Sequence, residues 1–191
     1  MDLLFASSNK NKVEEVKLIF NKHNIISLAD LNDYDEVDEN GSSFHENAYL
    51  KAKYFYDKYK IAVFADDSGL VVEALNGNPG IRSARYSGEN ATYLSNNLKL
   101  LAELKDKTNR HAYFISVICF IDESGEVHYF EGRVDGEISQ SIQSDNGFGY
   151  DPIFYLPEYN KTFAELGSEK NKISHRAKAL FSLNKFLKRE V

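Results

Sequence analysis

DLLFASSNKNKVEEVKLIF, the segment over residues 2–20, decides the class of the fold. Its apolar run over 2–6 predicts a short buried strand, and the polar residues 7–9 end that strand. From 10 to 21 the apolar residues recur at helical spacing, which predicts a helix. Those apolar residues are Val13, Val16, Ile19 and Phe20. The chain therefore opens with a strand, a polar turn and a helix, a pattern typical of α/β proteins.

The rest of the chain continues this alternation of strands and helices. Apolar runs predict further strands over 24–28, 61–65, 111–121, 127–134 and 153–156. Helical spacing predicts further helices over 44–59, 91–104 and 172–188. The polar run Asp66-Asp67-Ser68-Gly69 is expected to end the strand over 61–65. We predict a single α/β domain over residues 1–191, built on a mixed sheet.

The composition is that of a globular protein with excess negative charge. Lys and Arg number 23 against 29 Asp and Glu, and the formal net charge of -6 argues against a general nucleic-acid or anionic-membrane binder. Cys119 is the only cysteine, so an intrachain disulfide and a Cys-based zinc site are both excluded. No run approaches the roughly 20 apolar residues of a membrane span. Residues 1–5 lack the features of a secretory signal, so we expect a cytoplasmic protein.

The polar turn after the first strand is a candidate anion-binding site. It consists of Ser7, Ser8, Asn9, Lys10, Asn11 and Lys12. Unpaired backbone N–H groups and the positive end of the helix dipole meet at such a turn, and Lys12 adds a charge one turn into the helix. The alternative is a helix N-cap with solvated lysines, since the glycine pattern of a P-loop is missing.

Two adjacent carboxylates, Asp66 and Asp67, follow the predicted strand over 61–65. Burying them is costly unless positive groups meet them, and ligands usually bind near strand ends in α/β sheets. Side chains alternate along a strand, so the two aspartates are expected to point to opposite sides. The functional interpretation is a Mg²⁺ ligand or a general base; the alternative is an Asx turn that ends the strand.

A second source of carboxylates is the acidic stretch over 30–39. Such stretches are more often solvated and mobile. Because Mg²⁺ takes one or two protein carboxylates together with substrate phosphates and water, Asp38 or Glu39 is a candidate second ligand. Four histidines have no companions at metal-ligand spacing and are interpreted as surface or strand residues: His23, His45, His111 and His128.

Cations gather at the start of the predicted helix over 172–188. They are Lys170, Lys172 and Arg176, with His175 beside them. Cations at a helix start oppose the helix dipole, so an anion should compensate them: the acidic stretch over 30–39 or a phosphorylated ligand. Arg176 can grip a phosphate or a base carbonyl through its fixed fork of donors, and His175 can bond a base edge. The alternative is a surface helix with incidental charges.

The loop Phe148-Gly149-Tyr150-Asp151 combines aromatic residues with a flexible backbone. Aromatic rings beside glycines suit stacking on a flat base. The alternative is a hydrophobic plug. A nucleoside polyphosphate with Mg²⁺ would use all four features: the phosphate-type turn, the paired carboxylates, the cation cluster and this loop.

Six motifs in a fixed order carry a family resemblance. They are Ser7-Ser8-Asn9-x-x-Lys12, Ser43-Phe44-x-Glu46-Asn47-Ala48, Ala65-Asp66-Asp67-Ser68-Gly69-Leu70, Pro79-Gly80-x-x-Ser83-Ala84-Arg85-Tyr86-Ser87-Gly88, Gly147-Phe148-Gly149-Tyr150-Asp151-Pro152-Ile153-Phe154 and Lys170-Asn171-x-Ile173-Ser174-His175-Arg176. With these motifs the chain resembles the inosine triphosphate pyrophosphatase (Ham1-like) family from Leu3 to about Leu187.

The resemblance implies an elongated mixed sheet flanked by helices, two lobes around a central cleft, and a cytoplasmic homodimer. It implies Mg²⁺-dependent hydrolysis of XTP, ITP and dITP to the monophosphate and pyrophosphate, which keeps deaminated purines out of DNA and RNA. By position, Asp67 matches the proton acceptor and a metal ligand, and Asp38 or Glu39 matches the other metal ligand. The positions that match substrate-binding residues are Ser7 to Lys12, Ser68, Phe148 to Asp151, Lys170, His175 and Arg176.

Two other functions stay open on the sequence. One is a pyrophosphatase of similar shape with a different base choice, such as pyrimidine or modified nucleotides. The other is a regulatory protein that binds a nucleotide without cleaving it, against which the complete carboxylate set argues.

Overall fold

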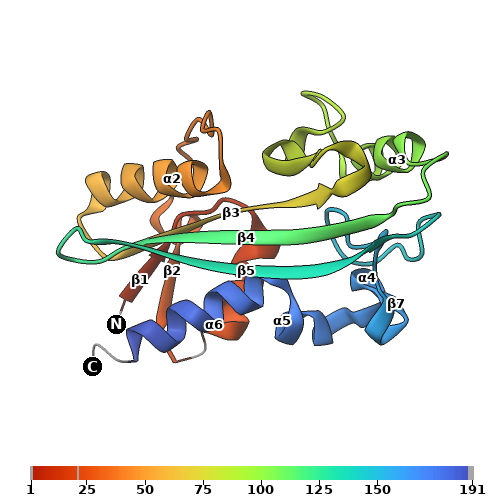
Figure 1. Cartoon of the computed structure of the whole chain (residues 1–191). Helices are drawn as coiled ribbons and strands as arrows, with labels where there is room; N and C mark the ends of the chain where they lie inside the picture. Colours follow the sequence, from red (N-terminus) through yellow and green to blue (C-terminus); the bar gives the residue numbers. More distant parts are fainter. Residues whose placement is uncertain (1, 21, 189–191) are drawn as a thin grey trace. The chain divides into compact units, whose positions relative to one another are not determined.

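The computed structural model describes residues 2–20 and 22–188 (Figure 1). The strands are β1 (Asp2–Phe5), β2 (Asn24–Ser27), β3 (Val63–Val72), β4 (His111–Ile121), β5 (Val127–Ile138), β6 (Phe154–Leu156) and β7 (Lys161–Thr162). The α-helices are α1 (Lys10–Ile19), α2 (Phe44–Tyr59), α3 (Tyr93–Glu103), α4 (Phe163–Leu166), α5 (Lys170–Ile173) and α6 (His175–Leu187). The helix predicted over 10–21 is α1; its predicted last residue, Asn21, lies outside the described residues.

The strands form a mixed sheet, as predicted, in the order β2-β1-β3-β4-β5-β6-β7. β1 pairs in parallel with β2, with Leu3 opposite Ile25, and in parallel with β3, with Leu4 opposite Val63. β5, β6 and β7 pair antiparallel. Parallel strands at one end and antiparallel strands at the other explain why the sequence shows both β–α alternation and a hairpin.

The chain divides into two compact units, each with its own apolar core. The first comprises residues 1–67, 116–132 and 175–191, and the second comprises residues 68–115 and 133–174. The long strands β3, β4 and β5 contribute residues to both units. The prediction of one domain over 1–191 did not include this division.

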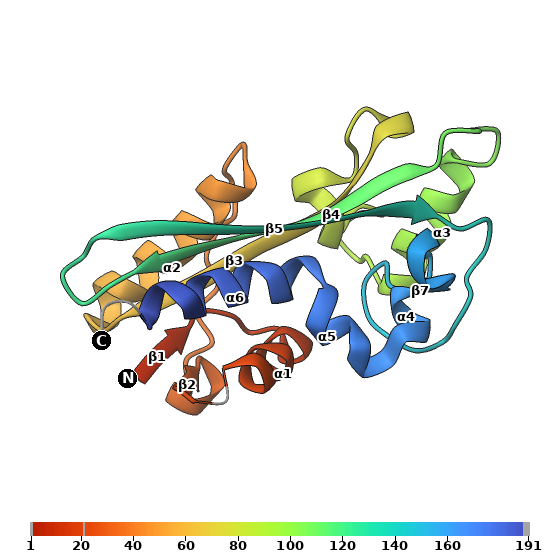
Figure 2. The ribbon, with the colours of Figure 1, turned by 60° about the horizontal axis from the view of Figure 1, so that its bottom comes forward.

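In the first unit, α1 and α6 cover one face of the sheet and α2 covers the other (Figures 1 and 2). The core on the α1–α6 side is aromatic: the Phe64 ring of β3 lies 4.9 Å from Phe5 and 5.9 Å from Phe20. Leu180 and Leu183 of α6 belong to the same buried cluster. Strand alternation places Phe64 and Asp66 on the same face of β3, so the side chain of Asp66 lies on the same side of the sheet as this aromatic core.

A glycine allows α6 to lie close to the sheet. A Cβ atom added to Gly132 of β5 would lie 1.9 Å from the carbonyl oxygen of His175 and 2.7 Å from the amide nitrogen of Ala179. Both contacts are to helix backbone, which cannot yield as a flexible side chain could. The first turn of α6 therefore depends on glycine at position 132.

On the opposite face, α2 begins and ends where the sequence predicted. The Ser43 side chain caps it by accepting a hydrogen bond from the Glu46 amide at 3.1 Å. Ala48, Ala52 and Phe55 form its buried stripe. Asn47 lies beside this stripe and is also buried, which directs one polar side chain of α2 toward the sheet.

In the second unit, three phenylalanines pack around β4, β6 and α4. The ring centroid of Phe114 lies 4.6 Å from Phe154 and 5.7 Å from Phe163. Leu100 and Leu104, from α3 and the residue after it, complete the buried cluster together with Tyr150. This core supports the loop that carries Phe148.

The structure corrects the predicted bounds at three places. β3 does not end at Asp66: it runs on through Gly69 to Val72. β5 extends past Val134 to Ile138, with alternating burial along its second half. The helix predicted over 172–188 is two helices, α5 and α6, because Ser174 takes an extended conformation (φ -64°, ψ 161°).

Candidate functional site

The turn between β1 and α1 is a helix N-cap. Asn9 is the N-cap residue, and its side chain accepts a hydrogen bond from the Lys12 amide at 3.3 Å. The Ser7 hydroxyl accepts one from the Asn9 amide, also at 3.3 Å. The exposed residues of the turn are Ser8, Lys10 and Asn11. The turn thus contains the N-cap of the alternative interpretation, but its lysines are not both solvated, because Lys12 turns inward.

Asp66 is the acceptor to which Lys12 turns. The Lys12 Nζ atom lies 3.2 Å from Oδ1 and 3.0 Å from Oδ2 of Asp66, and the Arg176 Nε atom lies 3.2 Å from Oδ2. Asp66 is buried, at 2% exposure. Burial alone would raise the pKa of Asp66, but Lys12 and Arg176 together hold it well below its usual range. The Asp66 carboxylate therefore stays ionised between two cations.

Asp67 has different partners, as the predicted alternation requires. Its Oδ2 atom accepts a hydrogen bond from the Asn47 Nδ2 atom of α2 at 3.0 Å. Burial raises the pKa of Asp67 to about 6, and the negative charge of Glu39 acts in the same direction. Lys51, Lys12 and the Asn47 hydrogen bond oppose that rise. A carboxylate with a pKa near neutrality can accept a proton from water and release it again.

Glu39 and Asp38 differ in position. Glu39 is half-buried, its Oε1 atom lies 2.7 Å from the Lys51 Nζ atom, and its charge acts on Asp67. Asp38 is exposed. Two neighbouring carboxylates, of which Glu39 raises the pKa of Asp67, are a suitable pair for a divalent cation. The arrangement favours Glu39 over Asp38 as the partner of Asp67.

Arg176 enters the first unit from the first turn of α6. It is buried at 2% exposure, and it forms a second ion pair through Nη1 with Glu15 of α1. His175, the first residue of α6, is buried as well. Burial raises the cost of the Arg176 charge, and the two carboxylates keep its pKa high. The first unit thus brings together Lys12, Asp66, Asp67, Glu39, His175 and Arg176.

The predicted cations of the last segment find their anions within the protein. Lys170 pairs with Asp151 at 2.7 Å, and Arg176 pairs with Glu15 and Asp66. The sequence analysis allowed two compensating anions, the acidic stretch over 30–39 or a phosphorylated ligand; these three carboxylates belong to neither. Lys170 and Arg176 also lie on two separate helices, because the chain is extended at Ser174.

In the second unit, the loop around Phe148 is held from several sides. The Lys170 Nζ atom lies 4.2 Å from the centroid of the Phe148 ring, a cation–π contact. The Asp151 carboxylate accepts hydrogen bonds from the Phe148 amide at 3.2 Å and from Lys170 at 2.7 Å. The Asn97 Nδ2 atom of α3 donates to the Gly149 carbonyl at 3.1 Å. Phe148 is half-buried within this frame.

Two predicted binding residues of the second unit have distinct surroundings. Tyr150 is buried, and its hydroxyl donates to the Ser83 carbonyl at 2.7 Å, so its side chain supports the loop from inside. Ser68, on β3, is half-buried. The structure thus groups the predicted site residues into two sets, one in each unit.

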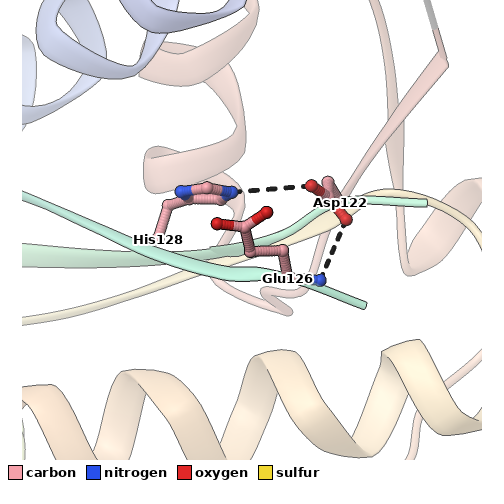
Figure 3. A group of neighbouring side chains, drawn as sticks. All are labelled: Asp122, Glu126 and His128. Atoms are coloured by element: carbon pink, nitrogen blue, oxygen red, sulfur yellow. Dashed lines mark hydrogen bonds and ion pairs between the residues drawn. The ribbon is translucent and has the colours of Figure 1, made fainter. Parts of the chain in front are cut away.

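A separate group of metal-ligating side chains lies at the hairpin between β4 and β5 (Figure 3). Asp122, Glu126 and His128 offer ligand atoms within 4.8 Å of one another. His128, for which the sequence indicated no metal-ligating companion, therefore has two, Asp122 and Glu126. The hairpin itself accounts for Asp122, whose Oδ1 accepts from the Ser124 amide at 2.8 Å and the Glu126 amide at 3.0 Å. Acidic groups of this chain could thus hold a metal ion.

Sequence reasoning gave no role to three polar side chains of the first unit: Glu15, Asn47 and Lys51. Asn47 was visible only as part of a matching motif. A usable signal was its position beside the apolar stripe of α2, where a polar residue must find a partner. Glu15 lies one turn after Lys12, but only the folded chain shows that it meets Arg176, 161 positions later.

Within residues 2–20 and 22–188, no helix combines the length and the apolar composition that crossing a membrane requires.

Comparisons with known proteins show which family the chain resembles. The model of the Ham1 family matches residues 3–186. The chain is 45% identical over 190 residues to a dITP/XTP pyrophosphatase of Staphylococcus aureus (strain Mu50 / ATCC 700699), covering 99% of this chain and 97% of the relative. It is 46% identical to a dITP/XTP pyrophosphatase of Thermoanaerobacter pseudethanolicus, covering 98% and 96%.

Solved structures agree with this result. The Staphylococcus aureus Ham1 protein superposes with a TM-score of 0.91 at 44% identity, over 100% of both chains. A HAM1 protein from Coxiella burnetii superposes with a TM-score of 0.91 at 37% identity, over 99% of both chains. The mixed sheet with flanking helices is therefore the fold of these proteins. From the family model, the relatives and the superpositions together, this chain belongs to the Ham1 family.

Proposed function

We propose that this chain hydrolyses deaminated purine nucleoside triphosphates (XTP, ITP and dITP) to the monophosphate and pyrophosphate, and so cleanses the nucleotide pool. The relatives at 45% and 46% identity are named dITP/XTP pyrophosphatases. The observation that carries the proposal is Asp67: a buried carboxylate whose pKa is raised to about 6, next to two lysines and a second carboxylate. That environment suits a group that takes a proton from an attacking water.

The reaction breaks the bond between the α-phosphorus and the oxygen that bridges to the β-phosphate. The water oxygen forms the new bond to the α-phosphorus, pyrophosphate leaves with the bridging oxygen, and Asp67 accepts the water proton. Lys12 carries positive charge toward the phosphates, where negative charge develops on the leaving group. Ser7 to Asn11 would bind the phosphates through backbone N–H groups and side-chain donors.

Mg²⁺ fits the carboxylates of the first unit. Asp67 and Glu39 offer carboxylate oxygens, the negative charge of Glu39 raises the pKa of Asp67, and a divalent cation relieves that repulsion. When bound, the cation would neutralise phosphate charge and polarise the phosphoryl group. Asp67 and Glu39 would hold it, with Asp38 as the other candidate ligand that the resemblance allows. Asn47 would keep one oxygen of Asp67 fixed by its hydrogen bond.

The resemblance assigns base-binding residues to each unit, and we propose a role for each set within its own unit. Phe148 offers a ring face for stacking, held by Gly149, Asp151 and Lys170. His175 and Arg176 supply donors that suit the keto group at position 6 of a deaminated purine. An amino group there would present a donor to donors, and an unpaired buried polar group costs about 1–3 kcal/mol. Ser68 and Tyr150 complete the substrate-binding set that we propose.

We also propose that the protein is a cytoplasmic homodimer. The family resemblance supports both statements. Size-exclusion chromatography with light scattering tests the dimer: a mass of about twice the chain mass supports it, and a mass equal to one chain refutes it.

A nucleotide panel tests the function. ITP, XTP, dITP, ATP, GTP and a pyrimidine triphosphate are incubated with the protein, with and without Mg²⁺, and pyrophosphate is resolved from orthophosphate. Pyrophosphate from ITP, XTP and dITP, and only with Mg²⁺, is the expected result. Preferred hydrolysis of the pyrimidine nucleotide would refute the base assignment, and binding without turnover would indicate a regulatory protein.

A further inference from the structure

Asp66 has no role in the reaction described above, yet it lies at the centre of the first unit. It is buried at 2% exposure and accepts from two cations on two different helices: Lys12 of α1 and Arg176 of α6. Both oxygens of the carboxylate lie within 3.2 Å of the Lys12 ammonium. A buried carboxylate in such a place either serves the fold alone or holds its partners for a purpose.

The geometry of Lys12 points to the second reading. An ammonium group has three donors, and two oxygens of one carboxylate occupy two of them at most. At least one donor of Lys12 is therefore not used by Asp66. Lys12 also follows the N-cap residue Asn9 by one turn, so its side chain starts at the proposed phosphate-binding turn.

Arg176 shows how Asp66 differs from the other buried carboxylate of the group. Arg176 is bound at Nη1 by Glu15 and at Nε by Asp66. Glu15 thus contacts Arg176 and Asp66 contacts both cations. Substituting either carboxylate disturbs Arg176, but only the substitution of Asp66 releases Lys12.

We infer that Asp66 is a positioning residue for substrate binding: its carboxylate fixes the Lys12 ammonium at the phosphates and the Arg176 guanidinium in one orientation. This inference rests on the proposed function and deepens it. It also predicts the direction in which the charge of Asp66 changes the affinity for anions. As a bare negative charge near a phosphate site, Asp66 would weaken anion binding, whereas as a positioning residue it strengthens anion binding despite its charge.

Calorimetric titration with inorganic tripolyphosphate in MgCl₂ separates these roles. Asp66→Asn keeps the shape and removes the charge. We expect it to weaken tripolyphosphate binding about tenfold, the effect of one well-placed charge-assisted hydrogen bond. Asp66→Glu keeps the charge and moves the carboxylate by about one bond length, and we expect binding to weaken there too. If Asp66→Asn does not fold, Asp66→Glu still tests the positioning role. Thermal unfolding shows whether each variant is folded.

The matched control is Glu15→Gln, which disturbs Arg176 and leaves the contact between Lys12 and Asp66 in place. We expect its dissociation constant for tripolyphosphate to stay within about twofold of that of the unaltered protein. Tighter or unchanged binding in Asp66→Asn overturns the inference, as does unchanged binding in Asp66→Glu. Equal weakening in Glu15→Gln overturns it as well, because the effect then reflects any loss of a buried ion pair.

The proposed function has its own readout in the same preparation. If the unaltered protein releases pyrophosphate from ITP while the Asp66 variants bind tripolyphosphate normally, only the positioning role fails. If the unaltered protein releases no pyrophosphate, the proposed function fails whatever the variants do. If it does not bind tripolyphosphate, the phosphate-binding role of Lys12 fails, and with it the positioning role of Asp66.

Discussion

Replacing Asp67 by asparagine should make the protein inactive and more stable at the same time. Asparagine has the same shape and still offers an oxygen to the Asn47 Nδ2–H group, so the hydrogen bond of 3.0 Å survives. What disappears is a proton acceptor and a negative charge. General base catalysis contributes about 10²–10⁴-fold to a rate, so the kcat for ITP should fall at least a hundredfold.

The stability change follows from burial. Burial raises the pKa of Asp67 from the ordinary 3.8 to about 6. Each pKa unit corresponds to 1.36 kcal/mol, so keeping the carboxylate ionised costs the folded protein about 3 kcal/mol once the pH exceeds 6. The amide has its own burial cost, so we expect a gain of about 1–3 kcal/mol for Asp67→Asn. In a chain of this length that raises Tm by several degrees.

The sign of the pH dependence is a separate check. Only well below the ordinary pKa of 3.8 is the carboxyl protonated in both the folded and the unfolded chain, so the advantage of the variant should be small at pH 4 and vanish at lower pH. The advantage should grow as the pH rises through 6 and then stay constant. Thermal unfolding in EDTA at pH 4 and at pH 8, followed by circular dichroism, measures it without any bound cation. A lower Tm than that of the unaltered protein at pH 8, or a difference that does not change with pH, would refute the reasoning about Asp67.

Three further predictions concern the elements that support the site. Gly132→Ala should lower Tm and reduce kcat/KM for ITP more than tenfold, because a Cβ atom 1.9 Å from the His175 carbonyl forces the start of α6 away from the sheet. Thermal unfolding and turnover assays measure the two effects, and normal turnover would contradict the role of this close approach. Asn97→Leu should raise KM for ITP several-fold, because it removes the hydrogen bond to the Gly149 carbonyl; Tm should change little, because the buried Oδ1 atom, which has no hydrogen-bond partner, is removed as well. An unchanged KM in steady-state kinetics would refute the support of the loop by Asn97. Asp33→Asn should lower Tm at pH 6 but not near pH 2. Hydrogen bonds from Lys58 and Tyr59 lower the pKa of Asp33 to about 2, so its stabilising contribution is lost as the pH falls from about 4 toward 2. A difference in Tm that does not change with pH would contradict this assignment.

The order of strands and helices was largely predictable because it is encoded in local periodicity. The helix over 44–59 and the strand over 111–121 were predicted with the bounds that the structure has. Both carry a clear apolar pattern, and the helix also has Ser43 as a local N-cap signal. Such signals depend on neighbouring residues only, so they can be read without knowing the fold.

The end of β3 was not predictable in this way. Asp66 and Asp67 resemble turn formers when their neighbours alone are considered. They lie instead within a buried strand, because Lys12 and Arg176 compensate the first and Asn47 binds the second. Those partners lie between 20 and 110 positions away in the chain. Long-range compensation overrides local preference here.

The break between α5 and α6 is an intermediate case. Ser174 interrupts a continuous helical pattern without proline or glycine. Serine is a favoured N-cap residue, so the sequence held a weak signal for a new helix at His175. What the sequence could not show is the function of the break, which places Lys170 and Arg176 on separate helices.

The contacts of the candidate site could not be predicted from the sequence. Matching motifs named Lys12 and Arg176, but not the carboxylates Asp66 and Glu15 that pair with them. The choice between Asp38 and Glu39 was also out of reach, since both lie in one acidic stretch. The contact of Glu39 with Lys51 and its effect on the pKa of Asp67 favour Glu39.

Hydrolysis of ITP in ¹⁸O-labelled water tests the central claim most directly. In the proposed reaction, water attacks the α-phosphorus and pyrophosphate leaves. Mass spectrometry of the products should therefore find the label in the nucleoside monophosphate and none in pyrophosphate. Label in pyrophosphate, or labelled orthophosphate as the first product, would show attack at the β- or γ-phosphorus and contradict the account.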